Sequence, residues 1–382
     1  MHDDHVMDLQ TTEDLGTEPG TYYQDIAVLA FPAPEDEPVS MQELKPKISV
    51  NLPNVDARLL LDGKYQSKIR LFNHLQKEDV EILIRFDEPF TARSLTLYGV
   101  GKGYPFKLMS SSDGERFTES SSGRAGTGVP QLAFNGFSFP AVNGKFFKLV
   151  IPNKAVQGSS RLAEIELNGS ERISKFQNKA GFIRFDGALE PIHADEISAT
   201  STITKGRIID LSSKLKADGT LDWDVPSGRW VIVRYGATLT GAICAQPARG
   251  GVGLEVDKLS KDAVERSFEQ GALHTIISDA RKNLGDTFYE TFDELTIDSW
   301  EVGSQNWTDG MLDLFREKVG YDMTPYLPCL TGRVVGDKAE TERFLWDLRR
   351  LIADLVADHY FGTFTQFAHK NGMHTSAETY HK

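Results

Sequence analysis

Eleven consecutive residues, running from Asp298 to Thr308, combine the side chains that carbohydrate chemistry requires. Two carboxylates lie three positions apart, accompanied by two tryptophans and two side-chain amides; the six residues are Asp298, Trp300, Glu301, Gln305, Asn306 and Trp307. Trp rings stack on the C–H faces of pyranose rings, whereas Asn and Gln amides hydrogen-bond sugar hydroxyls. A protonated carboxyl group can donate its proton to the leaving oxygen of a glycosidic bond. The pattern therefore indicates a carbohydrate site.

Within this stretch, Glu301 is the candidate general acid. Such an acid must stay protonated near neutral pH, and a neighbouring carboxylate such as Asp298 together with aromatic burial raises the pKa of a Glu in that direction. A structural interpretation stays open, because the same residues could form an acidic loop that caps the next helix, with Trp300 and Trp307 packed in the protein interior. The carbohydrate interpretation is the working hypothesis.

Two more carboxylates, Asp257 and Glu378, lie where predicted strands end. For Glu378 a functional and a structural role fit the sequence equally well, whereas Asp257 fits an acid satisfied within the turn that precedes a helix. His359 falls on the apolar stripe of a predicted helix and is interpreted as a core or interface histidine. Three other histidines lack the same-face spacing of a zinc-binding helix, namely His369, His374 and His381. The sequence by itself requires no cofactor, and it identifies no metal ligands.

Strands and helices alternate from about residue 171 to the end of the chain. Strands are predicted at 253–257, at 294–298 and in the stretch that leads to Glu378. Strand–helix–strand order predicts parallel βα units, and the long loops after the strands favour a (β/α)8 barrel over an open sheet. In such barrels the reactive groups lie at the carboxyl ends of the strands, which is where Asp298 and Glu378 fall.

The helices of this region have recognisable starts and stops. A polar cap precedes each apolar periodic stretch, and a glycine follows it. These starts and stops are Ser260 with Gly271, Thr308 with Gly320, and the capping box of Asp337 and Glu340 with Asn371–Gly372. The last of these helices is predicted to continue to about Lys370.

The preceding part of the chain has a different periodicity. Between about residues 48 and 170, apolar and polar residues alternate in short segments, which predicts an antiparallel β-sandwich. Ser112–Gly114 supplies a hairpin turn between two of these segments. Residues 1–47 contain a short apolar stretch, 25–31, that predicts a buried strand, followed by a proline-rich linker. The fold class is therefore α/β, a partial barrel with an inserted sandwich, divided into 1–47, 48–170 and 171–382.

Length and charge limit the possible functions. The chain has 382 residues and a net charge of −13, which argues against binding to nucleic-acid phosphates. It lacks an apolar stretch long enough to predict a membrane span, and Met1 is not followed by a signal-peptide pattern. Cys244 and Cys329 could form one bridge, but two free buried thiols is the favoured interpretation. Both ends look cut, so we expect a fragment of a longer chain.

The motifs of this chain resemble those of glycoside hydrolase family 106, the α-L-rhamnosidases. The resemblance covers nearly the whole sequence and is most specific between residues 298 and 350. It rests on Asp298-Ser299-Trp300-Glu301, Gln305-Asn306-Trp307-Thr308, Tyr326-Leu327-Pro328, Leu330-Thr331-Gly332-Arg333-Val334-Val335 and Arg343-Phe344-Leu345-Trp346-Asp347-Leu348-Arg349-Arg350, and on the earlier stretches Tyr22–Pro32, Asp218–Gly228 and Gly253–Ser260.

The resemblance implies hydrolysis of terminal α-L-rhamnosyl residues with inversion by two carboxyl groups. It implies that Glu301 is the general acid, that Asp298 tunes or orients it, and that Glu378 contacts the sugar. Family members are longer, so the second carboxylate is expected beyond Lys382, with Glu378 as the alternative within this chain. The resemblance further implies a sandwich of the galactose-binding type, a calcium ion whose ligands we do not assign, a rhamnose-containing carbohydrate as partner, and a periplasmic or extracellular location.

Two alternatives remain at this point. The first is a barrel glycosidase with another sugar preference, since the motif does not physically determine the sugar. The second is a noncatalytic carbohydrate-binding protein that binds through its β-sandwich. The aglycone, the linkage and the oligomeric state are not indicated by the sequence.

Overall fold

The computed structural model describes residues 22–37, 41–64, 68–71, 77–100, 103–125, 133–156, 158, 160–183, 197–242, 254–297 and 303–378. These residues gather in two compact units. The main parts of the first unit are Gln24–Gly236 and Thr324–Leu345, and those of the second are Ala237–Met323 and Trp346–Lys382. Within the described ranges, no helix is long and apolar enough to cross a membrane.

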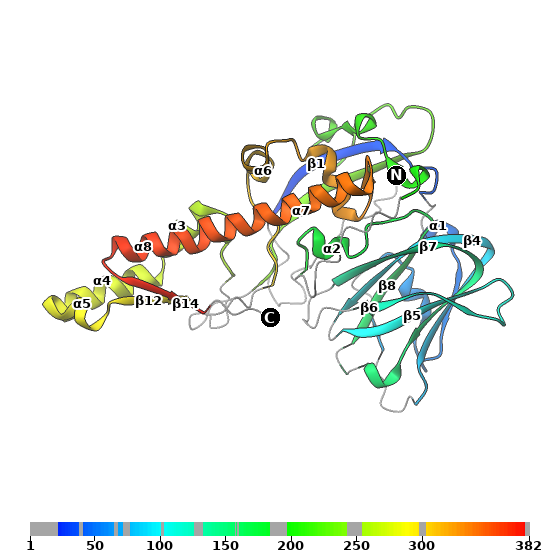
Figure 1. Cartoon of the computed structure of the whole chain (residues 1–382), viewed down its shortest axis with the longest axis horizontal. Helices are drawn as coiled ribbons and strands as arrows, with labels where there is room; N and C mark the ends of the chain where they lie inside the picture. The colour runs from blue at the N-terminus through cyan, green and yellow to red at the C-terminus, as the bar shows by residue number, and fades with distance from the viewer. Residues whose placement is uncertain are drawn as a thin grey trace. The chain divides into compact units, whose positions relative to one another are not determined.

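In the described part of the first unit, seven strands form one antiparallel sheet (Figure 1). The spatial order is β3-β8-β4-β7-β5-β6, and β2 pairs with β4. The strands are β2 (Lys47–Val50), β3 (Ile69–Arg70), β4 (Val80–Val100), β5 (Tyr104–Ser111), β6 (Thr118–Ala125), β7 (Ala133–Ile151) and β8 (Arg161–Asn168). The short helix α1 (Met41–Leu44) precedes them. The predicted antiparallel pairing of this region is confirmed.

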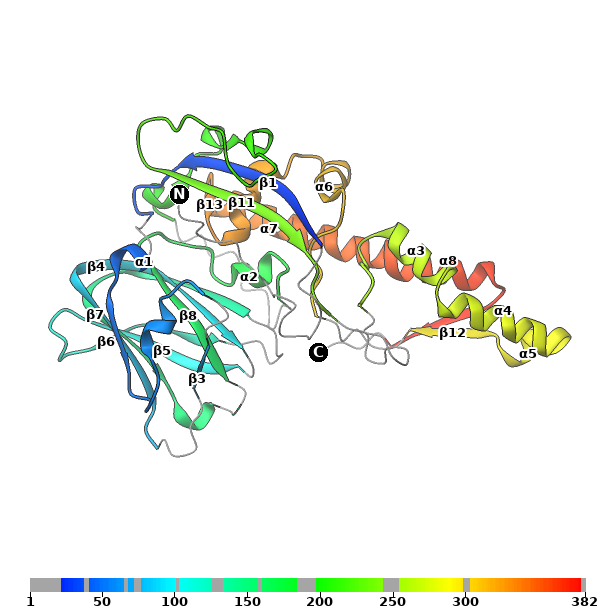
Figure 2. The ribbon, with the colours of Figure 1, turned by 180° about the vertical axis from the view of Figure 1, so that it is seen from behind.

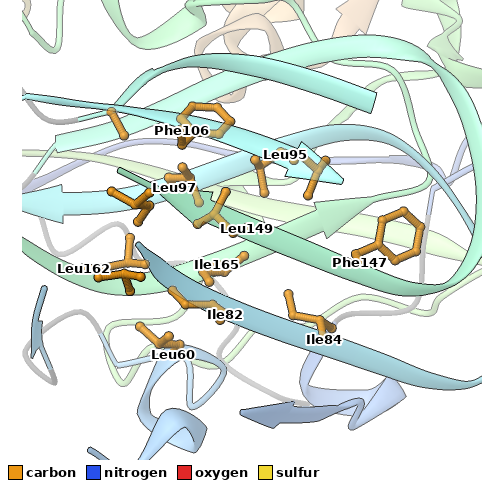
Figure 3. Packing of buried hydrophobic residues seen from close by; sticks show 14 of the residues in the cluster. Leu60, Ile82, Ile84, Leu95, Leu97, Phe106, Phe147, Leu149, Leu162 and Ile165 are labelled. Atoms are coloured by element: carbon orange, nitrogen blue, oxygen red, sulfur yellow. The ribbon is translucent and has the colours of Figure 1, made fainter. Parts of the chain in front are cut away.

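Strand β4 is long enough to pair with three other strands. Its first part pairs with β2 and β7, and its last part pairs with β7 and β8. Two register shifts separate these parts, and the alternation changes phase between them: Ile82 and Ile84 are buried before the shifts, whereas Leu95 and Leu97 are buried after them. These side chains pack into one core, shown in Figure 3. Burying each of them contributes about 1.5–3 kcal/mol.

The predicted turn at Ser112–Gly114 joins β5 to β6. The Asp113 carboxylate accepts hydrogen bonds from the backbone N–H groups of Glu115, at 2.8 Å, and Arg116, at 2.9 Å. Gly114 adopts the left-handed conformation, with φ +81°, that the reversal requires. The turn is therefore held by side-chain capping as well as by the ladder that follows it.

A three-stranded sheet of order β10-β1-β11 accounts for the apolar stretch near the N-terminus (Figure 2). It consists of β1 (Tyr23–Pro32), β10 (Ile209–Asp210) and β11 (Trp230–Thr238). Residues 27–31 are buried, which confirms the predicted strand at 25–31. The first unit also contains the helix α2 (Phe176–Lys179) and a parallel pair of short strands, β9 (Thr202–Ile203) and β13 (Val334–Val335).

The second unit contains the other parallel pair of the described residues, β12 (Glu294–Ile297) and β14 (His374–Ala377). Along the chain, three helices precede β12: α3 (Lys261–Glu269), α4 (Ala272–Leu284) and α5 (Phe288–Thr291). The helices α6 (Met311–Val319) and α8 (Thr363–Lys370) lie between β12 and β14 in the sequence. Buried side chains from α4, α5, α8 and β12, together with Met373 just before β14, form its apolar core, which includes Ile277, Leu295 and Phe364. Parallel pairing between strands separated by helices is the arrangement that the βα interpretation predicts.

One long helical segment leads to β14. It consists of α7 (Lys338–Leu355), a π-helical turn at Val356–Gly362, and α8. The predicted apolar stripe is buried on α7, and the helix stops at the predicted Asn371–Gly372. The capping box is only half formed: Asp337 accepts the Glu340 N–H at 2.7 Å, whereas the Glu340 carboxylate binds Lys205 and Tyr326, each at 2.6 Å.

Three local predictions for the second unit need correction. Residues 254–257 form no strand, although Leu254 makes a single bridge. Thr308 does not cap α6, because Gly310 occupies the N-cap position and the Thr308 hydroxyl donates to Asp257 instead. The helix α4 was not predicted, because Gly271 was interpreted only as the stop of α3; it is also the N-cap residue of α4.

Candidate active site

The described residues include part of the predicted site. Asp298, Trp300 and Glu301 lie outside the described residues. Gln305, Asn306, Trp307 and Glu378 are described, and all four belong to the second unit. Strand β12 ends at Ile297, the residue immediately before Asp298 in the chain.

Glu378 lies at the carboxyl end of a strand, as predicted. The register of the parallel pair places Ile297 beside Ala377, and the N–H of Glu378 donates to the carbonyl oxygen of Ile297 at 2.9 Å. The Glu378 side chain is exposed. Two neighbouring parallel strands therefore end together, one directly before Asp298 and the other directly before Glu378, and this is the edge at which βα folds place reactive groups.

The side-chain amide of Gln305 hydrogen-bonds the protein backbone. Its oxygen Oε1 accepts from the N–H of Lys258 at 2.9 Å, and its nitrogen Nε2 donates to the carbonyl oxygen of Val256 at 2.9 Å. Asn306 and Trp307 next to it are half-buried. The sequence does not distinguish an amide that binds a sugar from one that binds the backbone. The two backbone hydrogen bonds of Gln305 therefore could not be predicted from the sequence.

A second set of contacts involves Asp257. Its carboxylate accepts from the N–H of Leu259 at 3.0 Å and from the hydroxyl of Thr308 at 2.7 Å. Asp257 is thus satisfied within the turn that precedes α3, in agreement with its structural interpretation. The next residue of the loop, Asp309, accepts from the hydroxyl of Tyr22 at 2.9 Å, and this hydrogen bond raises the pKa of Tyr22.

Lys258 lies next to these contacts, and no motif of the sequence singles it out. Its ammonium group is buried, forms an ion pair with the Glu255 carboxylate and lies 5.3 Å from the centre of the Tyr360 ring. A buried lysine requires such partners, since an unpaired buried charge is costly. The only sequence feature that points to Lys258 is its position within Gly253–Ser260, one of the stretches that resemble the family.

His359 comes from the π-helical turn. Its Nδ1–H donates to the carbonyl oxygen of Leu259 at 2.7 Å. The histidine therefore binds the backbone, as its interpretation as an interface residue predicts. Among the residues that the structure describes, no three His, Cys, Asp or Glu side chains form a group that could hold a metal ion. Cys329 is a free buried thiol, as predicted, whereas Cys244 lies outside the described residues.

The chain is similar to known carbohydrate-active proteins. The model of glycoside hydrolase family 106, described as alpha-L-rhamnosidase, matches residues 1–382. A solved rhamnosidase from Novosphingobium sp. PP1Y is 28% identical, with a TM-score of 0.74 over 96% of this chain and 34% of its own. A Formosa agariphila protein named putative beta-glucuronidase is 44% identical over 184 residues, which are 48% of this chain and 15% of that protein. The chain thus spans about a third or less of these relatives' length.

Proposed function

The chain belongs to glycoside hydrolase family 106, the alpha-L-rhamnosidases, and on that premise we propose that it hydrolyses terminal α-L-rhamnosyl residues of polysaccharides or glycosides. The observation that supports a site at this place is the hydrogen bond from Glu378 N–H to the Ile297 carbonyl, at 2.9 Å. It brings together two strand ends that are followed by acidic residues. Asp298 comes directly after one strand, with Glu301 three residues later, and Glu378 comes directly after the other.

The proposed reaction is an inverting hydrolysis with two carboxyl groups. Glu301 acts as the general acid and protonates the glycosidic oxygen as the bond to the anomeric carbon breaks. A second carboxylate, expected beyond Lys382, removes a proton from the water that attacks the opposite face of the sugar. Asp298 raises the pKa of Glu301 by like-charge repulsion, so that the acid is protonated near neutral pH.

The remaining side chains of the loop fit a role in sugar binding. Trp300 and Trp307 would stack on the sugar ring, and Asn306 would bind hydroxyl groups, whereas the Gln305 amide already bonds the backbone of Lys258 and Val256. Glu378 would accept hydrogen bonds from the sugar at the strand end. The family resemblance also implies calcium, but the described residues include no group suited to it, so no step of the proposal depends on a metal.

The wider architecture belongs to the same proposal. The parallel pair β12–β14 would be part of a (β/α)8 barrel, and the antiparallel strands from Lys47 to Asn168 would form an inserted sandwich of the galactose-binding type. We expect the protein to act in the periplasm or outside the cell, where rhamnose-containing polysaccharides occur.

A second candidate is hydrolysis of a different sugar. The Formosa agariphila relative is named as a putative beta-glucuronidase, and it is more similar to half of this chain than the rhamnosidase is to the whole. The two candidates share the carboxylate chemistry and differ in the sugar that the loop side chains select.

The test uses the full natural polypeptide that carries this chain. We expect it to release p-nitrophenol from p-nitrophenyl α-L-rhamnoside, and Glu301→Gln to lower kcat by about 10²–10⁴-fold because the proton donor is lost. The control is Glu317→Gln on α6, which removes an exposed carboxylate and should leave the rate unchanged. NMR of the first product should show the inverted anomer.

Three other outcomes of this assay would contradict the proposed function or part of it. Undiminished turnover in Glu301→Gln would contradict the assignment of the acid. Turnover of p-nitrophenyl β-D-glucuronide in place of the rhamnoside would establish the second candidate. Binding of rhamnosides without any turnover would indicate the noncatalytic carbohydrate-binding alternative.

A further inference from the structure

The Gln305 side chain takes the place of a strand neighbour for the segment 254–258. In a β-ladder, a neighbouring strand supplies one acceptor and one donor to the backbone of the residues that it faces. Gln305 supplies both, with Oε1 at 2.9 Å from Lys258 N and Nε2 at 2.9 Å from Val256 O. A residue that offers only a donor or only an acceptor cannot make this pair of bonds.

A second connection lies three residues further along the loop. The Thr308 hydroxyl, which is buried, donates to the carboxylate of Asp257 at 2.7 Å. Asp257 is itself held by the N–H of Leu259. The following residue, Asp309, is bound by the hydroxyl of Tyr22 at 2.9 Å. The segment 305–309 is therefore attached to the protein at three successive points by side-chain hydrogen bonds.

The segment that receives these bonds has further contacts. The carbonyl oxygen of Leu259 accepts from His359, and the buried ammonium of Lys258 lies against the Tyr360 ring and the Glu255 carboxylate. His359 and Tyr360 belong to the π-helical turn, and π-turns inside α-helices occur frequently at functional sites. The two loops and the π-turn thus form one connected set of contacts, all within the second unit.

The contacts of Gln305 lie close in the sequence to Glu301, the proposed general acid. Glu301 precedes Gln305 by four residues, so the two Cα atoms are at most ~14 Å apart. On the other side of the loop, Ile297 is held in the β12–β14 pair, and its carbonyl accepts from Glu378. Seven residues, 298–304, connect these two held points. Fixing both ends of so short a connection restricts where its side chains can be placed.

We propose that Gln305 is a positioning residue for the general acid: by bonding the backbone at Val256 and Lys258, it fixes the carboxyl-terminal end of the loop that carries Glu301. This inference rests on the proposed function, in which Glu301 is the acid. Thr308 and Asp257 support the same end of the loop through their own hydrogen bond.

The experiment compares variants of the full natural polypeptide. Gln305→Glu keeps the shape and replaces the donor Nε2 by an oxygen that faces the carbonyl of Val256; Gln305→Ala removes both bonds. Thr308→Val removes the hydroxyl donor, and Thr308→Ser restores it. The matched control is Gln177→Ala in the first unit, because the Gln177 amide also binds backbone, accepting from Gly136 N at 3.2 Å, and is 2% exposed.

Steady-state kinetics on the rhamnoside give the first readout. We expect both Gln305 variants to lower kcat by about 10–100-fold, the usual effect of losing a residue that orients a reacting group, with KM changed less than about threefold. The limb of the pH–kcat/KM profile that reports the acid should move in the same variants. Thr308→Val should show a smaller effect of the same kind, and Thr308→Ser should recover the wild-type values. Gln177→Ala should leave kcat and the pH profile unchanged.

Three results would overturn the positioning role of Gln305. A rise in KM with unchanged kcat would show that Gln305 is a sugar ligand, and unchanged kinetics would show that it has no role; either overturns the proposal. An equal loss of activity in Gln177→Ala would also overturn it, since the effect would then follow from stability alone.

Amide hydrogen exchange separates this inference from the proposed function. Faster exchange of the Lys258 amide, which loses its acceptor, and of residues 298–308 is expected in Gln305→Ala whether or not the wild type cleaves rhamnosides, because it reports only how the loop is held. Absence of rhamnoside cleavage by the wild type would refute the proposed function. Unchanged exchange in this segment would refute the positioning role.

Discussion

The carboxylate of Glu37 accepts a hydrogen bond of 2.7 Å from the guanidinium of Arg333, which lies 296 positions further along the chain. Arg172 donates to the same carboxylate at 2.9 and 3.2 Å. The three side chains are only 7–15% exposed. Glu37 follows β1, Arg172 follows β8 and Arg333 precedes β13, so this ion cluster connects three separate parts of the first unit.

Replacing Glu37 by Gln should destabilise the protein by about 3–5 kcal/mol, because two buried guanidinium groups would lose their shared counter-ion. Urea unfolding at pH 7 measures the difference. The control is Asp87→Asn, which breaks a 3.7 Å pair with Lys47 on the surface, where the side chains are 80% and 70% exposed. That change should cost no more than about 1 kcal/mol. Equal effects of the two variants would contradict the role given to burial.

The contribution of Glu37 should disappear in acid. Burial by itself raises the pKa of Glu37, but the charges of Arg172 and Arg333 outweigh burial and hold the pKa well below its usual range. A carboxylate whose pKa is lowered by folding stabilises the protein above its unfolded pKa, about 4.3, and this stabilisation is lost as the pH falls below that value. The difference in unfolding free energy between wild type and Glu37→Gln should therefore be constant from pH 6 to 8 and shrink below about pH 5. A difference that grows in acid would be inconsistent with the cluster.

Glu164 on β8 should show the opposite dependence. Burial, and then repulsion from Glu166 and Asp62, raise its pKa to about 8. Because the folded protein favours the protonated carboxyl group, its contribution to stability is fully present below the unfolded pKa and is lost as the pH rises through about 8. Glu164→Gln should therefore match the wild type near pH 4 and exceed its Tm at pH 9, and thermal unfolding measures this. The exposed Glu88→Gln should show no such crossover; a Glu164→Gln variant that is less stable than the wild type at pH 9 would refute the prediction.

Gly332 should not tolerate a side chain. Its φ of +77° is a left-handed conformation, and a Cβ atom there would lie 2.6 Å from the Phe176 ring. Gly332→Ala should cost about 2–4 kcal/mol from backbone strain and overpacking, as measured by urea unfolding. Gly206→Ala is the control, because a Cβ at Gly206 meets no heavy atom within 4 Å. Similar stability of both variants would mean that Phe176 can move aside at little cost.

Trp307 allows a test of the proposed sugar binding. Replacing it by Ala should raise KM for the rhamnoside about five- to tenfold with little change in kcat, since stacking on the sugar is lost in ground state and transition state alike. Trp346→Ala on α7 is the matched control, because that ring is 50% exposed and lies outside the 298–308 stretch. Unchanged KM in Trp307→Ala would favour the packing interpretation of this tryptophan.

Features that repeat along the chain could be predicted from the sequence. The alternation of apolar residues such as Ile82 and Ile84 identified antiparallel strands, and the stripe from Phe344 to Leu355 identified the long helix, because each pattern reports which face of one element is buried. The strand before Asp298 and the strand before Glu378 were recognised in the same way, together with their parallel relation.

Contacts between distant segments were decided only by the tertiary structure. Thr308 has the residue type of a helix cap, yet its hydroxyl binds Asp257, and the Glu340 carboxylate binds Lys205 and Tyr326 in place of its own helix end. The amide of Gln305 could equally bind a sugar hydroxyl or a backbone. A polar side chain bonds the partner that the fold brings within about 3 Å, and which partner that is depends on how segments far apart in the sequence pack together.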